Sequence, residues 1–438
     1  MASFVVEGGS TLSGSIRPAG NKNAALPCIS AALLTEEPVV LENVPRILDV
    51  ETLVEIAAGL GAAVEWLDAT TLRIEASRIR SGSPDAGLAG RIRASILMAG
   101  PLLARLGRVR IPPPGGDVIG RRRLDTHFLA FRALGAEISV AERVLEIRAE
   151  ELTGRGIFLD EPSVTGTENA VMAAVTARGT TLLRNAATEP HVQDLCGLLN
   201  RMGARISGIG THILRIEGVG VLRGARFRLG PDHIEVGSFV GLAAATGSVL
   251  RIEDAPRAHL DSTLLGFGKL GVEVEFDGPD LVVRGDRDRQ IRRDAFGHIP
   301  RIDDGPWPGF PPDLTSIALV TATQCTGTIV VHEKMFESRM FFTDKLVAMG
   351  AQIILCDPHR AVVVGPSALR GQRLESPDIR AGMALLIAAL AAEGASLIQN
   401  IGQIERGYQA IDTRLRALGA RIRREEPREP VRAPDRGA

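Results

Sequence analysis

Six short motifs of the same kind constrain the fold of this 438-residue chain more than any other feature of its sequence. Each has an apolar residue, a glycine and a small residue, and the glycines recur about 70 residues apart, a period typical of internal repeats. The motifs are Leu60-Gly61-Ala62, Leu134-Gly135-Ala136, Met202-Gly203-Ala204, Leu270-Gly271-Val272, Met349-Gly350-Ala351 and Leu418-Gly419-Ala420. Alternating apolar and polar residues follow each glycine, as in a strand with one buried face. We therefore predict that each glycine ends a helix before a strand.

A second strand pattern lies roughly 25 residues before each motif glycine and usually follows a helical stretch rich in small residues. Examples of such stretches are NAALPCISAALL at 23–34 and IRAGMALLIAALAAEG at 379–394. One unit is thus helix, strand, helix, strand, strand, and it is too small to cover both faces of its own sheet. The pattern predicts the α/β (α+β) class, with units stacked in threes so that the helices lie inside and the sheets outside.

The composition excludes some classes of protein. Hydrophobic residues make up 45% of the chain and charged residues 24%, which is typical of a folded globular protein. The 51 basic and 52 acidic residues give a net charge of −1, so no global field attracts nucleic acid or an anionic membrane. Only two tryptophans and one tyrosine are present, which argues against an aromatic platform for single-stranded nucleic acid. We expect no nucleic-acid partner, and any polyanion must be bound locally.

The sequence Leu229-Gly230-Pro231-Asp232 interrupts the repeats near their middle and predicts a crossing between two domains. We expect residues 23–230 to form one three-unit domain that carries a lid loop. Residues 1–22 and 231–424 would form the second three-unit domain, with a ligand cleft between the two. Residues 425–438 are rich in proline and arginine and predict a disordered tail.

The cysteines and the N-terminal sequence bear on the compartment. The four cysteines are widely spaced, without a CxxC motif or a nearby histidine pair, so neither a zinc site nor a disulfide framework is predicted. The N-terminal sequence MASFVVEGGS lacks the features of a secretory signal, and the longest uncharged helical run, at 381–392, is too short to span a bilayer. We expect a cytoplasmic protein that does not insert into membranes.

Two segments carry candidate anion-binding chemistry. In PAGNKNAA at 18–25, an asparagine N-cap, backbone N–H groups and Lys22 come together at a helix start. Its alternative interpretation is an ordinary cap with a solvated lysine. In PPPGGDVIGRRR at 112–123, the prolines and glycines predict an exposed, hinged loop with Asp117 at its tip, followed by three arginines able to hold a phosphate or carboxylate. Its alternative interpretation is a solvated basic turn.

Further charges stand where predicted helices or strands meet loops: Arg93, Asp313, Arg339, Arg380 and Arg406. Asp313 begins a predicted helix at a place equivalent to Asp232 and Asp378 in their own repeats. Each of these aspartates, taken singly, is expected to cap its helix. Several helix N-termini facing one cleft would nevertheless concentrate positive potential there, and a nearly neutral protein could then bind a highly anionic substrate.

A set of motifs makes the resemblance to a known family specific. GNKNAALP, RASIL, PGGxxIGxR, PSVxxTEN, PDxIExG, PGFPxD, FExR and RGY occur in this order between Phe4 and about Arg423. The chain resembles the UDP-N-acetylglucosamine enolpyruvyl transferases, which make the first committed intermediate of peptidoglycan. The related shikimate-pathway transferase shares the fold but not this set of motifs. The resemblance implies a two-domain inside-out α/β barrel of six repeats, three in each domain.

The resemblance also implies a reaction and a site. An enolpyruvyl group would pass from phosphoenolpyruvate to the 3-hydroxyl of UDP-N-acetylglucosamine with release of phosphate, and no metal or other cofactor would take part. The implied catalytic residues are Asp117, Asp313, Lys22 and Arg406. The implied substrate-binding residues are Lys22, Asn23, Arg93, Arg122, Arg123, Leu124, Asp125, Thr126, Ser163, Val164, Asp313, Met335, Arg339, Arg380 and Arg406.

Within this set the resemblance assigns separate roles. Lys22, Arg122 and Arg406 would hold phosphoenolpyruvate, while Arg122 to Thr126 and Met335 would border the uridine nucleotide. Asp313 would take the hydroxyl proton. Asp117 would be the general acid, at a position where most members have a cysteine that the epoxide antibiotic fosfomycin alkylates. The aspartate implies that this chain is insensitive to fosfomycin.

Several other residues depart from the family pattern. They are Thr165-Gly166 for Gly-Ala, Thr188 for an arginine, Arg123 for a proline, His233 for an arginine and Gln403 for a histidine. Two alternatives therefore stand beside the cell-wall enzyme: a paralogous transferase with another nucleotide or sugar acceptor, and a non-catalytic member that binds a UDP-sugar or a partner protein. Retention of Lys22, Asp313, Arg339 and Arg406 argues against the non-catalytic alternative. The sequence does not indicate the oligomeric state.

Overall fold

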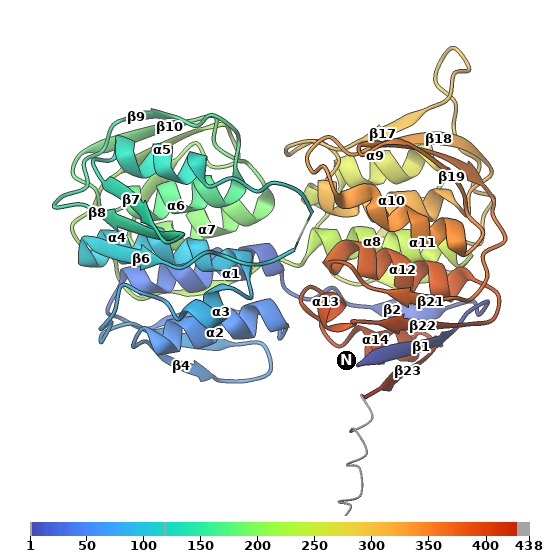
Figure 1. Ribbon diagram of the computed structural model, residues 1–438, viewed down its shortest axis with the longest axis horizontal. Coiled ribbons are helices and arrows are strands. Elements are labelled where there is room, and N and C mark those ends of the chain that lie inside the picture. Colours follow the sequence, from blue (N-terminus) through green and yellow to red (C-terminus); the bar gives the residue numbers. More distant parts are fainter. Residues whose placement is uncertain (1, 118, 427–438) are drawn as a thin grey trace, which may run out of the picture.

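Buried apolar side chains fall into two separate clusters in the computed structural model, which describes residues 2–117 and 119–426. One cluster is drawn from residues 24–229, and we call this part the first lobe. The other is drawn from residues 4–16 and 234–422, and we call it the second lobe. The lobes lie side by side (Figure 1). Residues 427–438, most of the expected tail, lie outside the described residues, and the last strand runs to Glu425.

Helices occur along the whole length of both lobes. The first lobe contains α1 (Lys22–Ala31), α2 (Leu48–Gly59), α3 (Ala86–Ala89), α4 (Ala99–Leu106), α5 (Asp125–Ala133), α6 (Val164–Ala174), α7 (Pro190–Arg201) and the 3₁₀ turns η1 (Ala32–Leu34) and η2 (Arg93–Met98). The second lobe contains α8 (His233–Ala245), α9 (Asp261–Lys269), α10 (Thr315–Ala322), α11 (Thr343–Ala348), α12 (Ile379–Ala391), α13 (Gly402–Glu405), α14 (Ile411–Ala417), η3 (Arg257–His259), η4 (Pro312–Leu314) and η5 (Arg339–Phe342).

The strands of the described residues form six small sheets, three in each lobe. In the first lobe the orders are β13-β3-β5-β4 (Arg226–Arg228, Val39–Glu42, Leu72–Glu75, Ala63–Trp66), β6-β8-β7 (Arg108–Ile111, Val144–Arg148, Glu137–Ala141) and β11-β12-β10-β9 (Arg205–Ser207, Ile213–Glu217, Thr180–Arg184, Gly156–Phe158). In the second lobe they are β15-β16-β14-β2 (Val274–Asp277, Asp280–Arg284, Val249–Ile252, Ser13–Ile16), β17-β18-β20-β19 (Arg301–Asp303, Gly327–His332, Arg360–Gly365, Gln352–Asp357) and β21-β22-β1-β23 (Arg373–Glu375, Ala395–Gln399, Ser3–Glu7, Arg421–Glu425).

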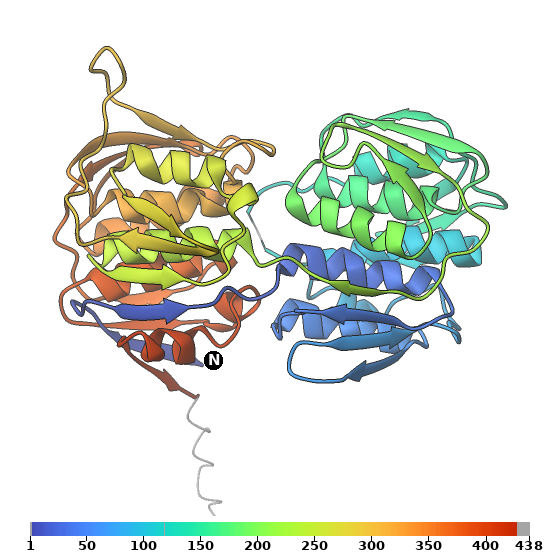
Figure 2. The same cartoon turned by 180° about the vertical axis from the view of Figure 1, so that it is seen from behind.

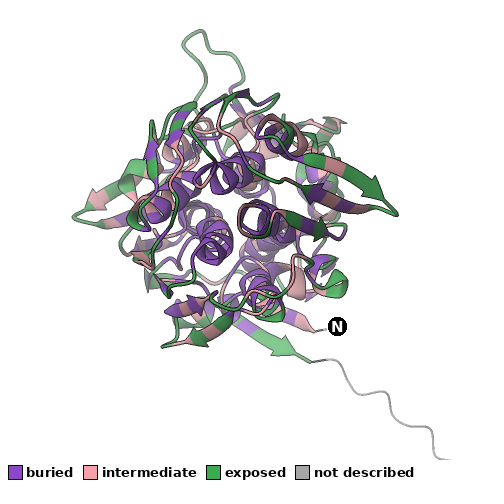
Figure 3. Ribbon diagram, turned by 90° about the vertical axis from the view of Figure 1, so that its left-hand side faces the viewer, coloured by how far each residue is buried: buried purple, intermediate pink, exposed green. Residues whose placement is uncertain are grey.

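The helices richest in small apolar residues lie inside the lobes. Every residue of α8 and α10 is buried, as are nearly all residues of α12, and these three helices pack against one another. An end-on view of the first lobe shows buried helices surrounded by sheets whose outer residues are exposed (Figure 3). This arrangement follows from the sequence, because a helix that is apolar all round must be covered on every side. The fold is therefore a mixed α/β fold with interior helices.

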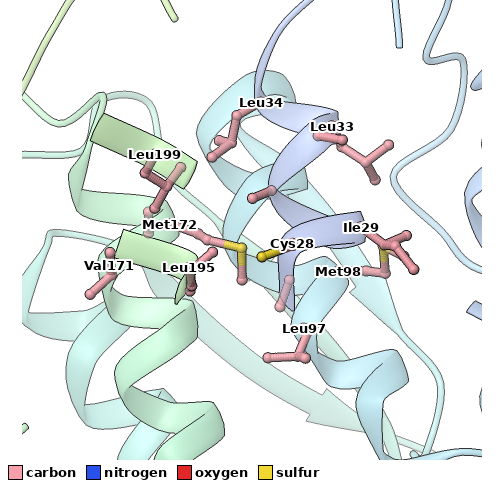
Figure 4. Close-up of a cluster of buried hydrophobic side chains, with 14 of the residues drawn as sticks. Cys28, Ile29, Leu33, Leu34, Leu97, Met98, Val171, Met172, Leu195 and Leu199 are labelled. Carbon is pink, nitrogen blue, oxygen red and sulfur yellow. The ribbon is translucent and has the colours of Figure 1, made fainter. Parts of the chain in front are cut away.

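Side chains from three helical segments meet at the centre of the first lobe. Cys28 and Ile29 of α1 lie beside Leu97 and Met98 of η2 and Met172 of α6 (Figure 4). All five are fully or almost fully buried. Sulfur-containing and small side chains fill such a helix junction well, because they adapt to irregular gaps.

The prediction for the six motif glycines is confirmed. Each follows the last turn of a helix with a positive φ, from 80° at Gly271 to 111° at Gly61. At Gly61 the N–H donates to the carbonyl of Ala58, while the N–H of Ala62 donates back to Ala57, and the same pair of hydrogen bonds recurs at the other five motifs. This is the Schellman ending, which favours glycine because only glycine adopts positive φ without steric cost.

The chain crosses between the lobes twice, and the two crossing segments lie side by side. Gly20 pairs with Pro231 as an isolated β-bridge, flanked by backbone hydrogen bonds from Asn21 to Gly230 and from Asp232 to Ala19. Figure 2 shows both segments where they pass from one lobe to the other. The crossing is therefore at one edge of the interface, next to the first turns of α1 and α8.

The loop at 112–124 agrees only in part with the exposed loop that the sequence predicts. Pro113, Arg121 and Arg123 are exposed, whereas Pro112 and Ile119 are buried, and the loop reaches from the first lobe toward the second and returns (Figure 1). The N–H of Ser338 donates to Ile119 and the N–H of Arg121 donates to Glu337, both residues of the second lobe. Glycines at 116 and 120 with φ of 103° and 137° allow the necessary turns. The loop is therefore a packed bridge, and Val118 lies outside the described residues.

Replacing a motif glycine with alanine tests the role of positive φ without a change in packing. Gly203 is exposed, has a φ of 100° and has no atom within 4 Å of an added Cβ. Gly203→Ala should therefore destabilise the first lobe by about 1–2 kcal/mol through backbone strain alone. The measurement is the urea unfolding transition of that lobe, followed by circular dichroism.

The matched control is Gly59→Ala, an exposed glycine at the end of α2 that also has open space around its Cβ but no positive φ. This variant should be neutral or more stable, because alanine is the better helix former. Equal destabilisation by both substitutions would contradict the assignment.

Candidate functional site

A cavity of about 680 Å³ lies between the lobes, and most of the predicted site residues line it. The predicted residues in its wall are Lys22, Asn23, Arg93, Asp117, Arg122, Arg123, Ser163, Val164, Asp313, Met335, Arg339, Arg380 and Arg406. Both lobes contribute, as do the loop at 112–124 and the first turns of α1, α6, α8 and α12. Helix N-termini carry partial positive charge, so this arrangement favours an anionic ligand.

A buried network of charges lies at the base of the cavity. Asp49, in the first turn of α2, pairs with Lys22 Nζ at 2.8 Å and with Arg406 Nε at 2.7 Å. Lys22 is only 6% exposed, so the interpretation of a solvated lysine is excluded. Burial raises the pKa of Asp49, but Lys22 and Arg406 outweigh this effect and hold the pKa below its ordinary value. One carboxylate thus fixes two cations from opposite lobes.

Arg406 also contacts the loop at 112–124. Its guanidinium donates to the carboxylate of Asp117 and, at 2.8 Å, to the amide oxygen of Gln403. Asp117 therefore lies at the tip of the loop and faces the second lobe. The Asp117–Arg406 pair is one of the contacts that hold the loop across the cleft, and both residues are mostly buried.

Two arginines of the second lobe hold Asp313. Its Oδ1 accepts from Arg339 Nη2 at 3.1 Å, and its Oδ2 accepts from Arg380 Nε at 3.0 Å. Burial alone would raise the pKa of Asp313, but the charges of Arg380 and Arg339 lower it far below the ordinary value. Asp313 is therefore ionised at neutral pH, as a proton acceptor must be.

The helix-cap interpretation holds for two of the three equivalent aspartates. Asp232 accepts from the N–H groups of Ile234 and Glu235, and Asp378 caps α12 in the same manner. Asp313 instead lies within η4 and turns its carboxylate to the arginines. This difference distinguishes Asp313 from the two aspartates that cap helices.

The two arginines around Asp313 make further contacts. Arg339 Nε faces Oε2 of Glu333 at 3.5 Å, and the guanidinium of Arg380 lies over the ring of Tyr408. The lining as a whole includes eight lysine and arginine side chains and seven acidic ones, so it carries a formal charge of +1. Burial raises the pKa values of two of the acidic side chains, Glu168 and Glu189, which shifts this balance further toward positive charge.

Arg93 ties the base of the bridging loop to the wall of the first lobe. Its Nη2 donates to the carbonyls of Arg122 and Arg123 at 2.7 and 3.1 Å. Burial, and secondarily the charge of Arg122, lower the pKa of Arg93 to about 10, so it stays charged at neutral pH. Ser163 caps α6 by accepting from the N–H of Gly166. Met335, in the second lobe, is partly exposed across the cavity.

Three predicted site residues do not line the cavity. Leu124 precedes α5 and packs beside the core of the first lobe, and Asp125 is exposed in the first turn of α5. Thr126 is buried, and its hydroxyl donates to Asp160 at 2.8 Å. These residues lie behind Arg122 and Arg123, at the edge of the cavity.

Sequence reasoning missed several residues of the cavity wall. Asp49 has the sequence pattern of an ordinary acidic residue in a first helical turn, so no local signal distinguishes it. Glu168 lies within the motif PSVTGTEN but was not assigned a role of its own. Glu189, His191 and Trp307 are further missed residues, and only the three-dimensional fold brings them together.

The residues that depart from the family pattern make specific contacts in the structure. The Thr188 hydroxyl donates to the carbonyl of Trp307 across the lobes, and Gln403 supports Arg406. Arg123 pairs with Asp160, while Thr165 contacts the ring of His127. His233 lines the cavity at the start of α8.

Neither a metal cluster nor a membrane span is found in the part of the chain that the structure describes. No group of three or more histidine, cysteine, aspartate or glutamate side chains there is arranged to hold a metal ion. No helix within residues 2–117 and 119–426 combines the length and apolarity needed to cross a membrane.

Comparison with known proteins identifies the class to which this fold and site belong. The family model of EPSP synthase (3-phosphoshikimate 1-carboxyvinyltransferase) matches residues 6–415, and the chain belongs to this family of enolpyruvyl transferases. A solved structure, the enolpyruvyl transferase NikO from Streptomyces tendae, superposes with a TM-score of 0.86 at 25% identity and covers 97% of this chain and 98% of its own.

Relatives with higher sequence identity show which enolpyruvyl transferases this chain resembles. The UDP-N-acetylglucosamine 1-carboxyvinyltransferase of Bradyrhizobium diazoefficiens is 61% identical over 421 residues, which are 96% of this chain and 97% of the relative. The protein of the same name from Treponema denticola is 53% identical over 426 residues, which are 97% of this chain and 100% of the relative. The resemblance that the motifs indicated is thereby confirmed.

Removal of the charge of Asp49 should reveal the strength of the buried network. Asp49→Asn leaves Lys22 buried without its counter-charge and Arg406 with Asp117 alone, and it should destabilise the protein by about 3–5 kcal/mol at pH 7. Because the folded pKa is lowered, the stabilisation by Asp49 is present above its unfolded pKa of about 4 and is lost as the pH falls through the folded value. The difference between the two proteins should therefore shrink at acid pH, as measured by urea unfolding from pH 7 to pH 3.

Glu55→Gln is the matched control, because Glu55 is an exposed residue of the same helix. It should shift the free energy of unfolding by less than about 0.5 kcal/mol at any of these pH values. A pH-independent loss in Asp49→Asn would show that packing and not charge is responsible.

Proposed function

We propose that this chain transfers the enolpyruvyl group of phosphoenolpyruvate to the 3-hydroxyl of UDP-N-acetylglucosamine and releases phosphate. This reaction is the first committed step of peptidoglycan synthesis, so it serves the cell wall and with it cell shape and division. The observation that carries the proposal is the convergence of Lys22, Arg406, Arg339 and Arg380 on one cavity that also holds Asp117 and Asp313. The names of the relatives with more than half of their residues in common support the same reaction.

The cations suit phosphoenolpyruvate, which carries a carboxylate and a phosphate. Lys22 and Arg406 are already fixed by Asp49, so they need little rearrangement to hold an anion. Arg122 also lines the cavity and supplies a third positive charge, as the resemblance implies. Arg339 and Arg380 line the same cavity, and their charges favour a carboxylate or a phosphate there.

The two aspartates divide the proton transfers. Asp313 takes the proton of the 3-hydroxyl as that oxygen bonds to C2 of phosphoenolpyruvate, and C3 gains a proton from the carboxyl of Asp117, the general acid. Asp117 must be protonated for this step, so its ion pair with Arg406 has to open first. The product is a tetrahedral ketal whose charges the arginines and the lysine stabilise. The carboxylate of Asp117 then takes a proton back from C3, and the double bond re-forms as the bond between C2 and the phosphate oxygen breaks. The leaving phosphate receives the proton that Asp313 took from the hydroxyl.

Substrate binding must change the surroundings of Asp313. The charges of Arg380 and Arg339 lower the pKa of Asp313 far below its ordinary value, so Asp313 is a weak base as long as both ion pairs persist. A ligand anion that shares Arg339 and Arg380 weakens these pairs and raises the basicity of Asp313 when the hydroxyl is in place. The loop at 112–124 closes the other side of the cavity and excludes water.

Three further assignments complete the proposal. The first and second lobes are domains whose boundaries lie within the two crossing segments, near the predicted 22/23 and 230/231, with Lys22 on the side of the first lobe as the first residue of α1. Each is an inside-out barrel of three repeats. The six Schellman turns and the parallel strand pair that recurs in five of the six sheets support the repeats. The reaction takes place in the cytoplasm, where four unpaired cysteines such as those of this chain stay reduced.

Phosphate release from phosphoenolpyruvate tests the function directly. The purified protein should release phosphate with UDP-N-acetylglucosamine and form the enolpyruvyl ether, identified by mass spectrometry. Activity only with another nucleotide or sugar would identify a paralogous transferase, and no activity with any acceptor would favour a non-catalytic member.

Asp313→Asn is the control for chemistry at the site. It should lower kcat by at least about 10³-fold, because loss of a general base costs that order of magnitude. Its circular dichroism spectrum and its binding of the nucleotide sugar should be unchanged. A normal rate would refute the assignment of Asp313 as base.

Fosfomycin provides an independent test of Asp117. The described residues place no cysteine in the cavity wall, and three of the four cysteines are buried in the lobes. Incubation with fosfomycin should therefore cause no time-dependent loss of activity. Asp117→Cys should create such inactivation and a covalent adduct on residue 117, because a thiolate opens the epoxide and a carboxylate here does not. Inactivation of the unchanged protein would contradict the assignment.

A further inference from the structure

We propose that His233 is a positioning residue for the Asn21-Lys22-Asn23 turn, which it holds by accepting a hydrogen bond on Nδ1 as a neutral ring. The inference rests on the proposed function only in that this turn would bind phosphoenolpyruvate. His233 begins α8 in the second lobe, and the turn begins α1 in the first. The histidine thus acts at the crossing between the lobes and touches neither reacting atom.

The side chain of Asn21 has a fixed orientation. Its Oδ1 accepts from the N–H of Asn23 at 2.8 Å and from the N–H of Ala24 at 3.2 Å, so it is the N-cap of α1. Its Nδ2 therefore points the other way, to Nδ1 of His233 at 3.2 Å. Two donors cannot face each other, so Nδ1 of His233 carries no proton and the ring is neutral with its proton on Nε2.

The neighbours of His233 leave little room for another arrangement. The ring of His191, from α7 of the first lobe, stacks on it with centroids 6.3 Å apart and an interplanar angle of 15°. The rings of Trp307 and His259 meet its edge at 5.7 and 6.2 Å. Nδ1 of His191 has no hydrogen-bond partner among the described residues. The histidine is buried, with 2% of its surface exposed.

The charges that face this cluster come from every neighbouring element. They are His191, His259, Asp232 at the start of α8, Asp313 of η4 and Arg380 of α12. Burial is the largest effect and lowers the pKa of His233 to about 3, with His259 and Arg380 acting in the same direction and Asp313 against it. The neutral state therefore persists through the whole range in which the free side chain titrates.

Loss of the acceptor would disturb the substrate-binding turn. A protonated His233 would present N–H to Nδ2 of Asn21, and the amide would have to turn away. The same amide caps the N–H groups of Asn23 and Ala24, so the first turn of α1 would lose its cap as well. Lys22 lies between these groups, and its N–H faces Oδ2 of Asp232 at 3.4 Å. The position of its ammonium thus depends on His233 through Asn21.

The first experiment measures the tautomer without any need for turnover. In protein labelled with ¹⁵N-histidine, one pair of ring signals should disappear in His233→Gln and so belongs to His233. That pair should show an unprotonated Nδ1 and a protonated Nε2 from pH 8 to pH 5. A proton on Nδ1, or a cationic ring above pH 6, would overturn the proposal.

The second experiment separates positioning from packing by comparing two variants. Glutamine at 233 can still accept from Asn21 through its amide oxygen, whereas leucine cannot. His233→Leu should lower kcat/KM for phosphoenolpyruvate about tenfold, mainly through KM, as expected for one unsatisfied buried donor. His233→Gln should restore it to within about twofold. Equal loss in both variants, or no loss in either, would overturn the proposal.

The third measurement is the pH dependence of stability. A folded pKa of about 3 against an unfolded value of about 6.5 means that the neutral ring favours folding above pH 6.5 and that this advantage is lost as the pH falls toward 3. Between pH 6.5 and pH 3, each drop of one pH unit should lower the folding equilibrium constant of the unchanged protein. This drop should exceed the drop in His233→Gln by a factor of up to about ten.

His298→Gln is the matched control, since this histidine is exposed in a loop of the second lobe. It should reproduce the pH slope of the unchanged protein and its KM. If the protein proves inactive with every acceptor, the proposed function fails, while the tautomer and the pH slope still decide the role of His233. If the stability of His233→Gln and of His298→Gln depended on pH in the same way, the proposed role of His233 would be overturned.

Discussion

The pairing of one buried carboxylate with two cations underlies both the closed cleft and its affinity for anions. Asp49 comes from the first lobe with Lys22, while Arg406 comes from the second. Burial of three charges is costly unless each is satisfied, so the lobes gain this network only when they approach one another. The same approach brings Arg406 to Asp117 on the bridging loop. The charges that we propose to bind a ligand are thus also the charges that join the two lobes.

A second network of buried ion pairs lies in the part of the cavity wall that the second lobe forms. Asp313 holds Arg339 and Arg380 in place, and Arg339 is also within 3.5 Å of Glu333, which is buried without exposure. Burial raises the pKa of Glu333 to about 9 against the effect of Arg339, so this carboxyl adds little negative charge. The outcome is a wall with two arginines and one ionised aspartate. Such a wall is fixed before substrate arrives, and fixed dipoles and charges are what catalysis of a charged intermediate requires.

Local patterns in the sequence predicted much of the fold and part of the site. The glycine turns follow from the φ that a Schellman ending demands, and the interior helices follow from stretches without a polar face. An asparagine cap at the start of α1 was also predicted, and Asn21 fills this role. Asp49 and His191 were not predicted, because their partners come from other elements, such as Arg406 of the second lobe for Asp49 and His233 of α8 for His191. The bridging loop was expected to be exposed, since its prolines and glycines give no sign of the second lobe that covers it.

The placement of the first strands in the second lobe sets the order in which the molecule can be completed during synthesis. β1 pairs with β22 and β23 at the far end of the chain, and β2 pairs in parallel with β14. The core of the first lobe comes from one continuous stretch, so it can form as soon as that stretch has left the ribosome. Residues 3–7 must wait for nearly the whole chain. During that interval Phe4, Val5 and Val6 lie on a strand without its two pairing partners, so both of its edges are open to wrong pairing.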